Sequence, residues 1–157
     1  MAGREDYILR EIALLRQAIS VMLKYRESGR HREALDEALR AQEKLFARST
    51  VELSALSLED LIALARKDET PEGGDEKLLA YAAMLRETGL VYAAMDRETA
   101  AESCFQLALH VMLTVAAGQN PPAAATLATM RELLARIPAD MLQAPVIELL
   151  ARFGEPA

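Results

Sequence analysis

The chain has 157 residues, 52% of them hydrophobic, and a formal net charge of −6. This composition supplies enough apolar surface for a folded domain and argues against disorder, while the acidic balance argues against nucleic-acid binding, because phosphates would be repelled. The single cysteine, Cys104, excludes an internal disulfide. The longest apolar stretch, 107–118, is too short to span a bilayer, and no signal-peptide pattern is present, so we expect a cytoplasmic protein without a membrane segment.

A first pair of helices is predicted over residues 5–48. In its first helix, about 5–27, apolar residues recur every three or four positions, and Leu14 is one of several that widen this apolar face. Gly29 is predicted to end the helix, because glycine adopts the left-handed conformation without steric cost. The second helix, about 32–47, follows after so short a loop that the two helices must pack antiparallel.

A short helix is predicted over residues 57–66. Ser57 has the character of an N-cap, and Asp60 stands three residues later in the capping-box position. The next segment, 67–76, is charged and holds a proline and two adjacent glycines. We therefore expect 67–76 to be a flexible loop.

A second helix pair is predicted over residues 76–117, followed by C-terminal capping helices over 121–153. The second helix of this pair is apolar around most of its circumference, which is typical of a helix at the centre of a domain or at an interface. No segment shows the alternation of a strand. The sequence thus predicts a single all-α domain, 1–157, of about six helices.

The helix pair occurs twice, at an offset of 67 residues. Small residues on the second helix of each copy would allow its partner to approach closely. A repeat of this kind predicts that both copies pack in the same way. The matched positions are Tyr25 and Tyr92, Ala34 and Ala101, Ala38 and Phe105, and Ala41 and Ala108.

The second copy resembles the tetratricopeptide repeat in five positions. The first copy departs from the pattern at Met22 and Ala38. The resemblance implies antiparallel helix hairpins in a right-handed stack with a concave groove that binds a helix or an extended peptide. The matching residues are Gly89, Tyr92, Ala101, Phe105 and Ala108.

Residues 5–115 also resemble a family of uncharacterised bacterial helical proteins. The similarity rests on the N-terminal segment Asp6-Tyr7-Ile8-Leu9-Arg10, on the turn between the first two helices, 29–41, and on the segment 57–61. It implies a helical fold and a bacterial source, and it implies no activity.

Candidate catalytic residues are few. His31 and His110 are the two histidines, and neither has the spacing of a metal ligand set. No zinc-protease, dithiol, serine-hydrolase or phosphate-loop motif occurs. Cys104 is either a small buried residue or a redox thiol, and the first reading is favoured. We expect a protein that is not an enzyme and binds neither a metal nor a cofactor.

The tetratricopeptide resemblance implies a partner-binding wall on the first helix of each copy. It would consist of Arg16, Leu23 and Arg26 in the first copy, and of Arg86 and Leu90 in the second. Three arginines beside apolar residues suit the capture of an acidic or C-terminal carboxylate-bearing protein or peptide.

Several alternatives stay open at this point. The arginines can instead pair with acids of the chain itself, such as Glu27 and Glu87. The leading hypothesis is that the protein is a non-enzymatic protein-interaction or scaffold module. A homodimer that covers the apolar surface with its own copy is the second, and a small-molecule-binding helical domain is the third.

Overall fold

The computed structural model describes residues 2–119 and 121–152, with side chains from Tyr7 onward. Every regular element in these ranges is a helix, which confirms the all-α class. The described residues form more helices than the six predicted, because α3 and the 3₁₀ helix are too short to show a helical period in the sequence. The elements are α1 (Ala2–Glu27), α2 (His31–Phe46), α3 (Thr50–Ser54), α4 (Leu58–Arg66), α5 (Pro71–Ala94), α6 (Glu98–Ala117), α7 (Ala124–Ala135), the 3₁₀ helix η1 (Ala139–Met141) and α8 (Ala144–Arg152).

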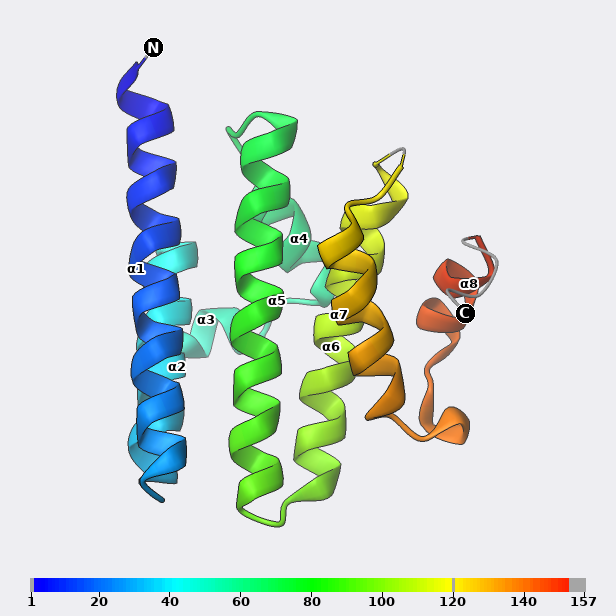
Figure 1. Cartoon of the computed structure of the whole chain (residues 1–157). Helices are drawn as coiled ribbons and strands as arrows, with labels where there is room; N and C mark the ends of the chain where they lie inside the picture. Colours follow the sequence, from blue (N-terminus) through cyan, green and yellow to red (C-terminus); the bar gives the residue numbers. More distant parts are fainter. Residues whose placement is uncertain (1, 120, 153–157) are drawn as a thin grey trace.

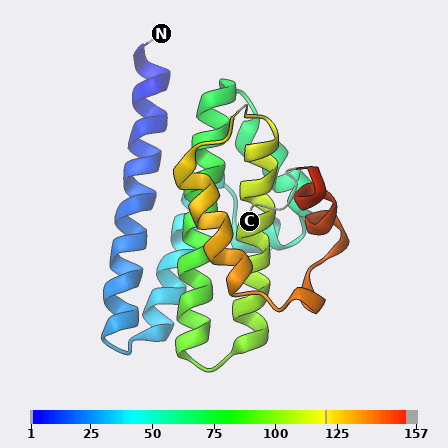
Figure 2. The ribbon, with the colours of Figure 1, turned by 45° about the vertical axis from the view of Figure 1, so that its right-hand side comes forward.

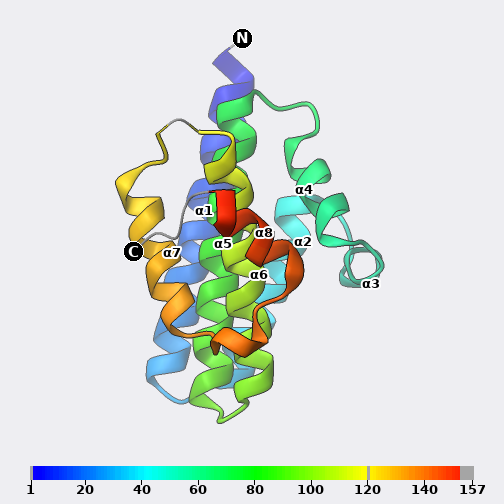
Figure 3. The same ribbon diagram turned by 90° about the vertical axis from the view of Figure 1, so that its right-hand side faces the viewer.

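The long helices pack in antiparallel pairs. α1 packs against α2 and α5 against α6, and α1 also contacts α5 directly. In Figure 1, α1, α5 and α7 run across the front, with α2 behind α1 and α6 behind α7. Figure 2 places α1 at the outer edge of the bundle. Figure 3 shows α8 beside α6 and the short helices α3 and α4 together on another flank.

Two local signals set helix ends as predicted. Gly29 follows α1 with φ +77°, a left-handed conformation that residues with a Cβ rarely adopt. At the start of α4, the Ser57 hydroxyl accepts a hydrogen bond from the Asp60 N–H at 3.1 Å, and the Asp60 carboxylate accepts one from the Ser57 N–H at 3.4 Å. This capping box confirms the short helix over 57–66.

The loop predicted over 67–76 is wrong beyond residue 70, because α5 begins at Pro71. Proline fits the first turn of a helix, where its missing N–H costs nothing, and the Thr70 hydroxyl caps the Gly73 N–H at 3.0 Å. The glycines serve close packing instead of flexibility. A Cβ on Gly73 would lie 3.1 Å from Ile8 Cδ1, and one on Gly74 would lie 3.0 Å from Arg66 Cγ.

A side chain of α6 attaches the C-terminal segment to the core. The Gln106 amide donates to the Met141 carbonyl at 3.0 Å and accepts a hydrogen bond from the Gln143 N–H. Both η1 and the start of α8 are thereby held to α6. The predicted capping helices over 121–153 correspond to α7 and α8, and residue 153 lies outside the described residues.

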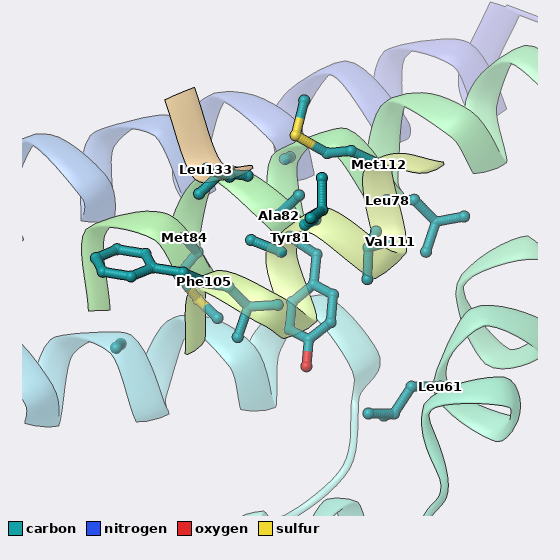
Figure 4. Close-up of a cluster of buried hydrophobic side chains, with 14 of the residues drawn as sticks. Leu61, Leu78, Tyr81, Ala82, Met84, Phe105, Val111, Met112 and Leu133 are labelled. Atoms are coloured by element: carbon teal, nitrogen blue, oxygen red, sulfur yellow. The ribbon is translucent and has the colours of Figure 1, made fainter. Parts of the chain in front are cut away.

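The apolar circumference of α6 is buried within the chain. α5 packs along one side of it, and α7 and α8 cover others. Figure 4 shows this core, in which Phe105, Val111 and Met112 of α6 meet Leu78 and Met84 of α5. The wide apolar surface of α6, which suggested a homodimer from the sequence, is thus used inside one chain.

The small residues matched between the two helix pairs lie at close helix contacts. Ala34 and Ala101 are both buried, in α2 and α6. In the second pair, Gly89 of α5 faces the Phe105 ring so closely that a Cβ there would lie 2.5 Å from Phe105 Cε1. Side-chain volume at these positions therefore controls the distance between paired helices.

Candidate functional site

Two of the three arginines of the predicted binding wall form ion pairs within the chain. Arg26 Nε donates to Glu87 Oε1 at 2.8 Å, and Glu87 is only 4% exposed, so this pair ties α1 to α5. Arg86 bonds Glu132 of α7, and this hydrogen bond holds the pKa of Glu132 below its ordinary value. These arginines join helices of the chain, as the alternative reading of the sequence allowed.

The remaining residues of the predicted wall lie on two helices, Arg16 and Leu23 on α1 and Leu90 on α5. Arg16 is exposed on α1 and forms no ion pair with a side chain that the structure describes. Leu23 is 36% exposed, and Leu90 is half-buried on α5. None of the predicted wall residues lines the groove between α1 and α2 that is described below.

Cys104 is a half-buried residue of α6. Burial raises the pKa of its thiol to about 11, and burial likewise raises the pKa of the neighbouring Tyr81 to about 12. A thiol with such a pKa is protonated at neutral pH, and the protonated form is a poor nucleophile. This favours the packing role over the redox role.

We expect Cys104 alkylation by iodoacetamide to rise with an inflection near pH 11 in the folded protein. In denaturant the inflection should return to the ordinary thiol pKa of about 8.5. The unfolded chain then loses this proton first, so the free energy of unfolding should fall as the pH rises from the ordinary value to about 11. A Cys104→Ala variant should show a smaller alkaline loss of stability, and an unchanged loss would contradict the assignment.

The histidines lie on different helices. His31 is the first residue of α2, and His110 lies on α6, where burial lowers its pKa and Glu59 of α4 acts in the opposite direction. Within the described ranges, no group of three or more His, Cys, Asp or Glu side chains could hold a metal ion.

A groove of about 750 Å³ lies between α1 and α2. Its floor is apolar and comes from buried residues of both helices, among them Leu15 and Leu45. Its rim includes two large apolar side chains that face solvent, Tyr7 at 58% and Leu14 at 57% exposed. The lining residues are Tyr7, Arg10, Glu11, Leu14, Leu15, Gln17, Ala18, Val21, Glu37, Arg40, Ala41, Lys44, Leu45 and Ala47.

The unequal lengths of the two helices create this groove. α1 has 26 residues and α2 has 16, so α1 extends beyond the end of α2, as Figure 1 shows. α2 ends at Phe46 because Ala47 adopts a left-handed conformation with φ 54°. Tyr7 and Leu14 are seven residues apart and therefore share one side of α1. Leu14 is one of the residues that widen the apolar face expected for this helix, and that excess width is the signal of the groove that the sequence offers.

Charged side chains surround the apolar floor. Glu11 Oε2 lies 3.4 Å from Nζ of the buried Lys77, and Nζ also lies 3.6 Å from Oε1 of Glu69. On α2, Arg40 Nη2 donates to Glu37 Oε2 at 2.9 Å. The groove thus combines an apolar floor with a rim that carries both charged side chains and the exposed Tyr7 and Leu14.

One described helix, α6, is long and apolar enough to cross a membrane by length and composition. More than half of its apolar window, 56%, is buried inside the structure, as in the core helix of a folded domain. Comparisons of the chain with protein-family models, with curated proteins and with solved structures gave no significant match.

Proposed function

We propose that this chain is a non-enzymatic protein-interaction module that binds a helix of a partner protein in the groove between α1 and α2. The observation that carries the proposal is an unfilled groove whose apolar floor continues into exposed Tyr7 and Leu14. Large exposed apolar side chains beside a concave surface are typical of recognition sites.

A helix is the occupant that suits this shape. An amphipathic helix offers apolar side chains at three- and four-residue spacing, and these enter a groove between two parallel ridges. The ridges here are the rows through Leu14 and Val21 of α1 and through Arg40 and Lys44 of α2. Small Ala18 and Ala41 leave room for the anchors of the partner helix.

The antiparallel pairs α1–α2 and α5–α6 support a tetratricopeptide-like stack as the scaffold. In such a stack each helix pair covers its neighbour, and the pair at the end keeps an uncovered side. The groove lies on the end pair, at the outer edge that Figure 2 shows. A small-molecule site is less well supported, because the floor lacks the convergent polar groups that fix a ligand's orientation.

A matched pair of variants tests this function. Leu14 and Leu9 are both exposed leucines of α1, at 57% and 60%, but only Leu14 lines the groove. The two lie about 140° apart around the helix. Leu14→Gln should weaken capture of a partner from native extract by roughly tenfold or more, as loss of an interface anchor does.

The Leu9→Gln variant is the control and should retain the partner at the wild-type level. Both variants should keep the wild-type melting temperature, because both side chains are exposed. Equal loss or equal retention of partners by the two variants would reject the groove as the binding surface.

A further inference from the structure

The second helix pair, α5–α6, shows how the groove on the first pair is filled. We infer that the occupant is a single helix of another protein, which runs antiparallel to α1 and inserts an aromatic side chain over Leu14 and Ala18. This inference rests on the proposed function of the groove. It is carried by the contacts that α2 and α4 make with the matching face of the second pair.

The two helix pairs are in register at the offset of 67 residues. α5 ends, and α6 begins, 67 residues after the corresponding ends of α1 and α2. In the first turn the Arg30 N–H donates to the Tyr25 carbonyl at 2.8 Å, and in the second the Arg97 N–H donates to the Tyr92 carbonyl at 2.9 Å. Each residue that lines the groove can therefore be compared with the residue 67 positions later.

The face that is open in the first pair is covered in the second. Leu14 matches Tyr81 and Lys44 matches Val111, and both residues of the second pair are buried while both of the first are exposed. The Phe46 ring of α2 packs edge-on against Tyr81, with ring centroids 5.1 Å apart. Figure 4 shows the Tyr81 ring directed away from α6, towards the end of α2. A helix placed on α1 as α2 is placed on α5 would continue this interface and cover the groove.

An aromatic anchor follows from the side-chain volumes on this face. Ala18 stands where the second pair has Leu85, and Leu14 stands where it has Tyr81. The first pair therefore leaves unfilled a space that the second pair fills with its own larger side chains. A partner helix has to fill that space from its side, and aromatic side chains offer the largest apolar volume for an interface anchor.

The direction and the number of partner helices follow from the same comparison. α1 and α5 run in the same direction in Figure 1, so α2 is antiparallel to α5, and a helix placed likewise is antiparallel to α1. Its C-terminal end would lie towards Tyr7. The match of Tyr7 is Gly74, where a Cβ would lie 3.0 Å from Cγ of Arg66 in α4. The bulk of Tyr7 thus excludes a second helix placed like α4, which leaves room for one.

A second copy of this chain does not present the required surface. The side of α2 that covers α5 carries Phe46, Leu45 and Ala38, and all three are buried inside their own chain. Exposing them would mean pulling α2 from α5. The helix is therefore expected from another protein, and a dimer is an outcome that the test can reveal.

A peptide with the sequence of residues 30–48 tests the inference, because it contains α2 with Phe46 near its C-terminal end. Its counterpart has alanine in place of Phe46. Binding of each labelled peptide to the full chain is measured by fluorescence anisotropy. We expect the peptide with Phe46 to bind roughly tenfold more tightly, as for an interface anchor, and Leu14→Gln in the full chain should weaken its binding.

Ala18→Leu locates the space that the aromatic ring fills. It introduces the residue that the second pair has at this position, so it should remove most of the preference for the peptide with Phe46. Leu9→Gln, an exposed change on α1 outside the groove, should retain the preference. The melting temperature of each variant shows whether it is folded.

The direction is measured on the wild-type chain and needs no variant. A nitroxide at the C-terminal end of the peptide with Phe46 should broaden the amide NMR signals of α1 near Tyr7. A nitroxide at the N-terminal end should broaden those near Val21. The reverse pattern would overturn the antiparallel placement.

The outcomes separate this inference from the proposed function. Equal binding of the two peptides, weakened by Leu14→Gln, would overturn the aromatic anchor and leave the groove in place. Failure of both peptides to bind, or binding that ignores Leu14→Gln, would overturn the inference, and the capture experiment with Leu14→Gln and Leu9→Gln still decides the groove. A dimer in sedimentation equilibrium that Leu14→Gln dissociates would show that a second copy is the occupant.

Discussion

Replacing Lys77 by alanine should lower the free energy of unfolding by about 3–5 kcal/mol, the cost of removing one partner from a buried ionic cluster. The Lys77 side chain is 11% exposed, and the carboxylates that it faces, Glu11 and Glu69, are 16% and 7% exposed. They come from α1 and from the turn before α5, so the lysine joins two segments far apart in sequence. Removing Lys77 leaves the carboxylates of Glu11 and Glu69 with no lysine to offset their charges.

A second substitution separates charge from packing at Lys77. Lys77→Met keeps an apolar stem of similar length and removes only the charge. Its loss of stability in urea denaturation should be close to that of Lys77→Ala, and adding Glu11→Gln to Lys77→Met should restore part of it. If Lys77→Met were as stable as the wild type, the lysine would serve only through its stem.

Replacing Leu109 by alanine should destabilise the protein by about 2–5 kcal/mol, through loss of buried apolar surface and the cavity that remains. Leu109 is fully buried, at 0% exposed, in α6, which packs against α5, α7 and α8. Because α6 is packed on several sides, the neighbouring side chains can fill only part of the cavity that Leu109→Ala leaves. Urea denaturation monitored by circular dichroism gives the change directly.

Leu107→Ala is the matched control for Leu109→Ala. It removes the same atoms from the same helix, but Leu107 is 38% exposed. Its cost should stay below about 1 kcal/mol, since little apolar surface returns to water and no closed cavity forms. Equal losses in the two variants would mean that α6 is not the centre of the core.

The helices could be predicted from the sequence because their signals are local. The three- and four-residue periodicity, Gly29 after α1 and the Ser57–Asp60 capping box each act within a few residues. The start of α5 was mistaken because Gly73 and Gly74 have the composition of a loop. Only the contacts with α1 and α4 reveal that they permit close packing.

The candidate site depends on features that no local signal carries. The groove exists because α2 stops at Phe46 while α1 continues, and the left-handed residue that ends α2 is Ala47, where glycine or asparagine would be usual. Arg26 and Arg86 have the residue type of a carboxylate-binding site. Their pairing with Glu87 and Glu132 depends on how α1, α5 and α7 are arranged in space.

The arrangement around α6 also has a consequence for folding during synthesis. α6 is apolar enough to pass for a membrane segment, and two of the helices that cover it, α7 and α8, follow it in the chain. During synthesis α6 therefore leaves the ribosome before α7 and α8, which complete its cover. Through that interval the nascent chain exposes the kind of surface that chaperones bind and that aggregates if it is left alone.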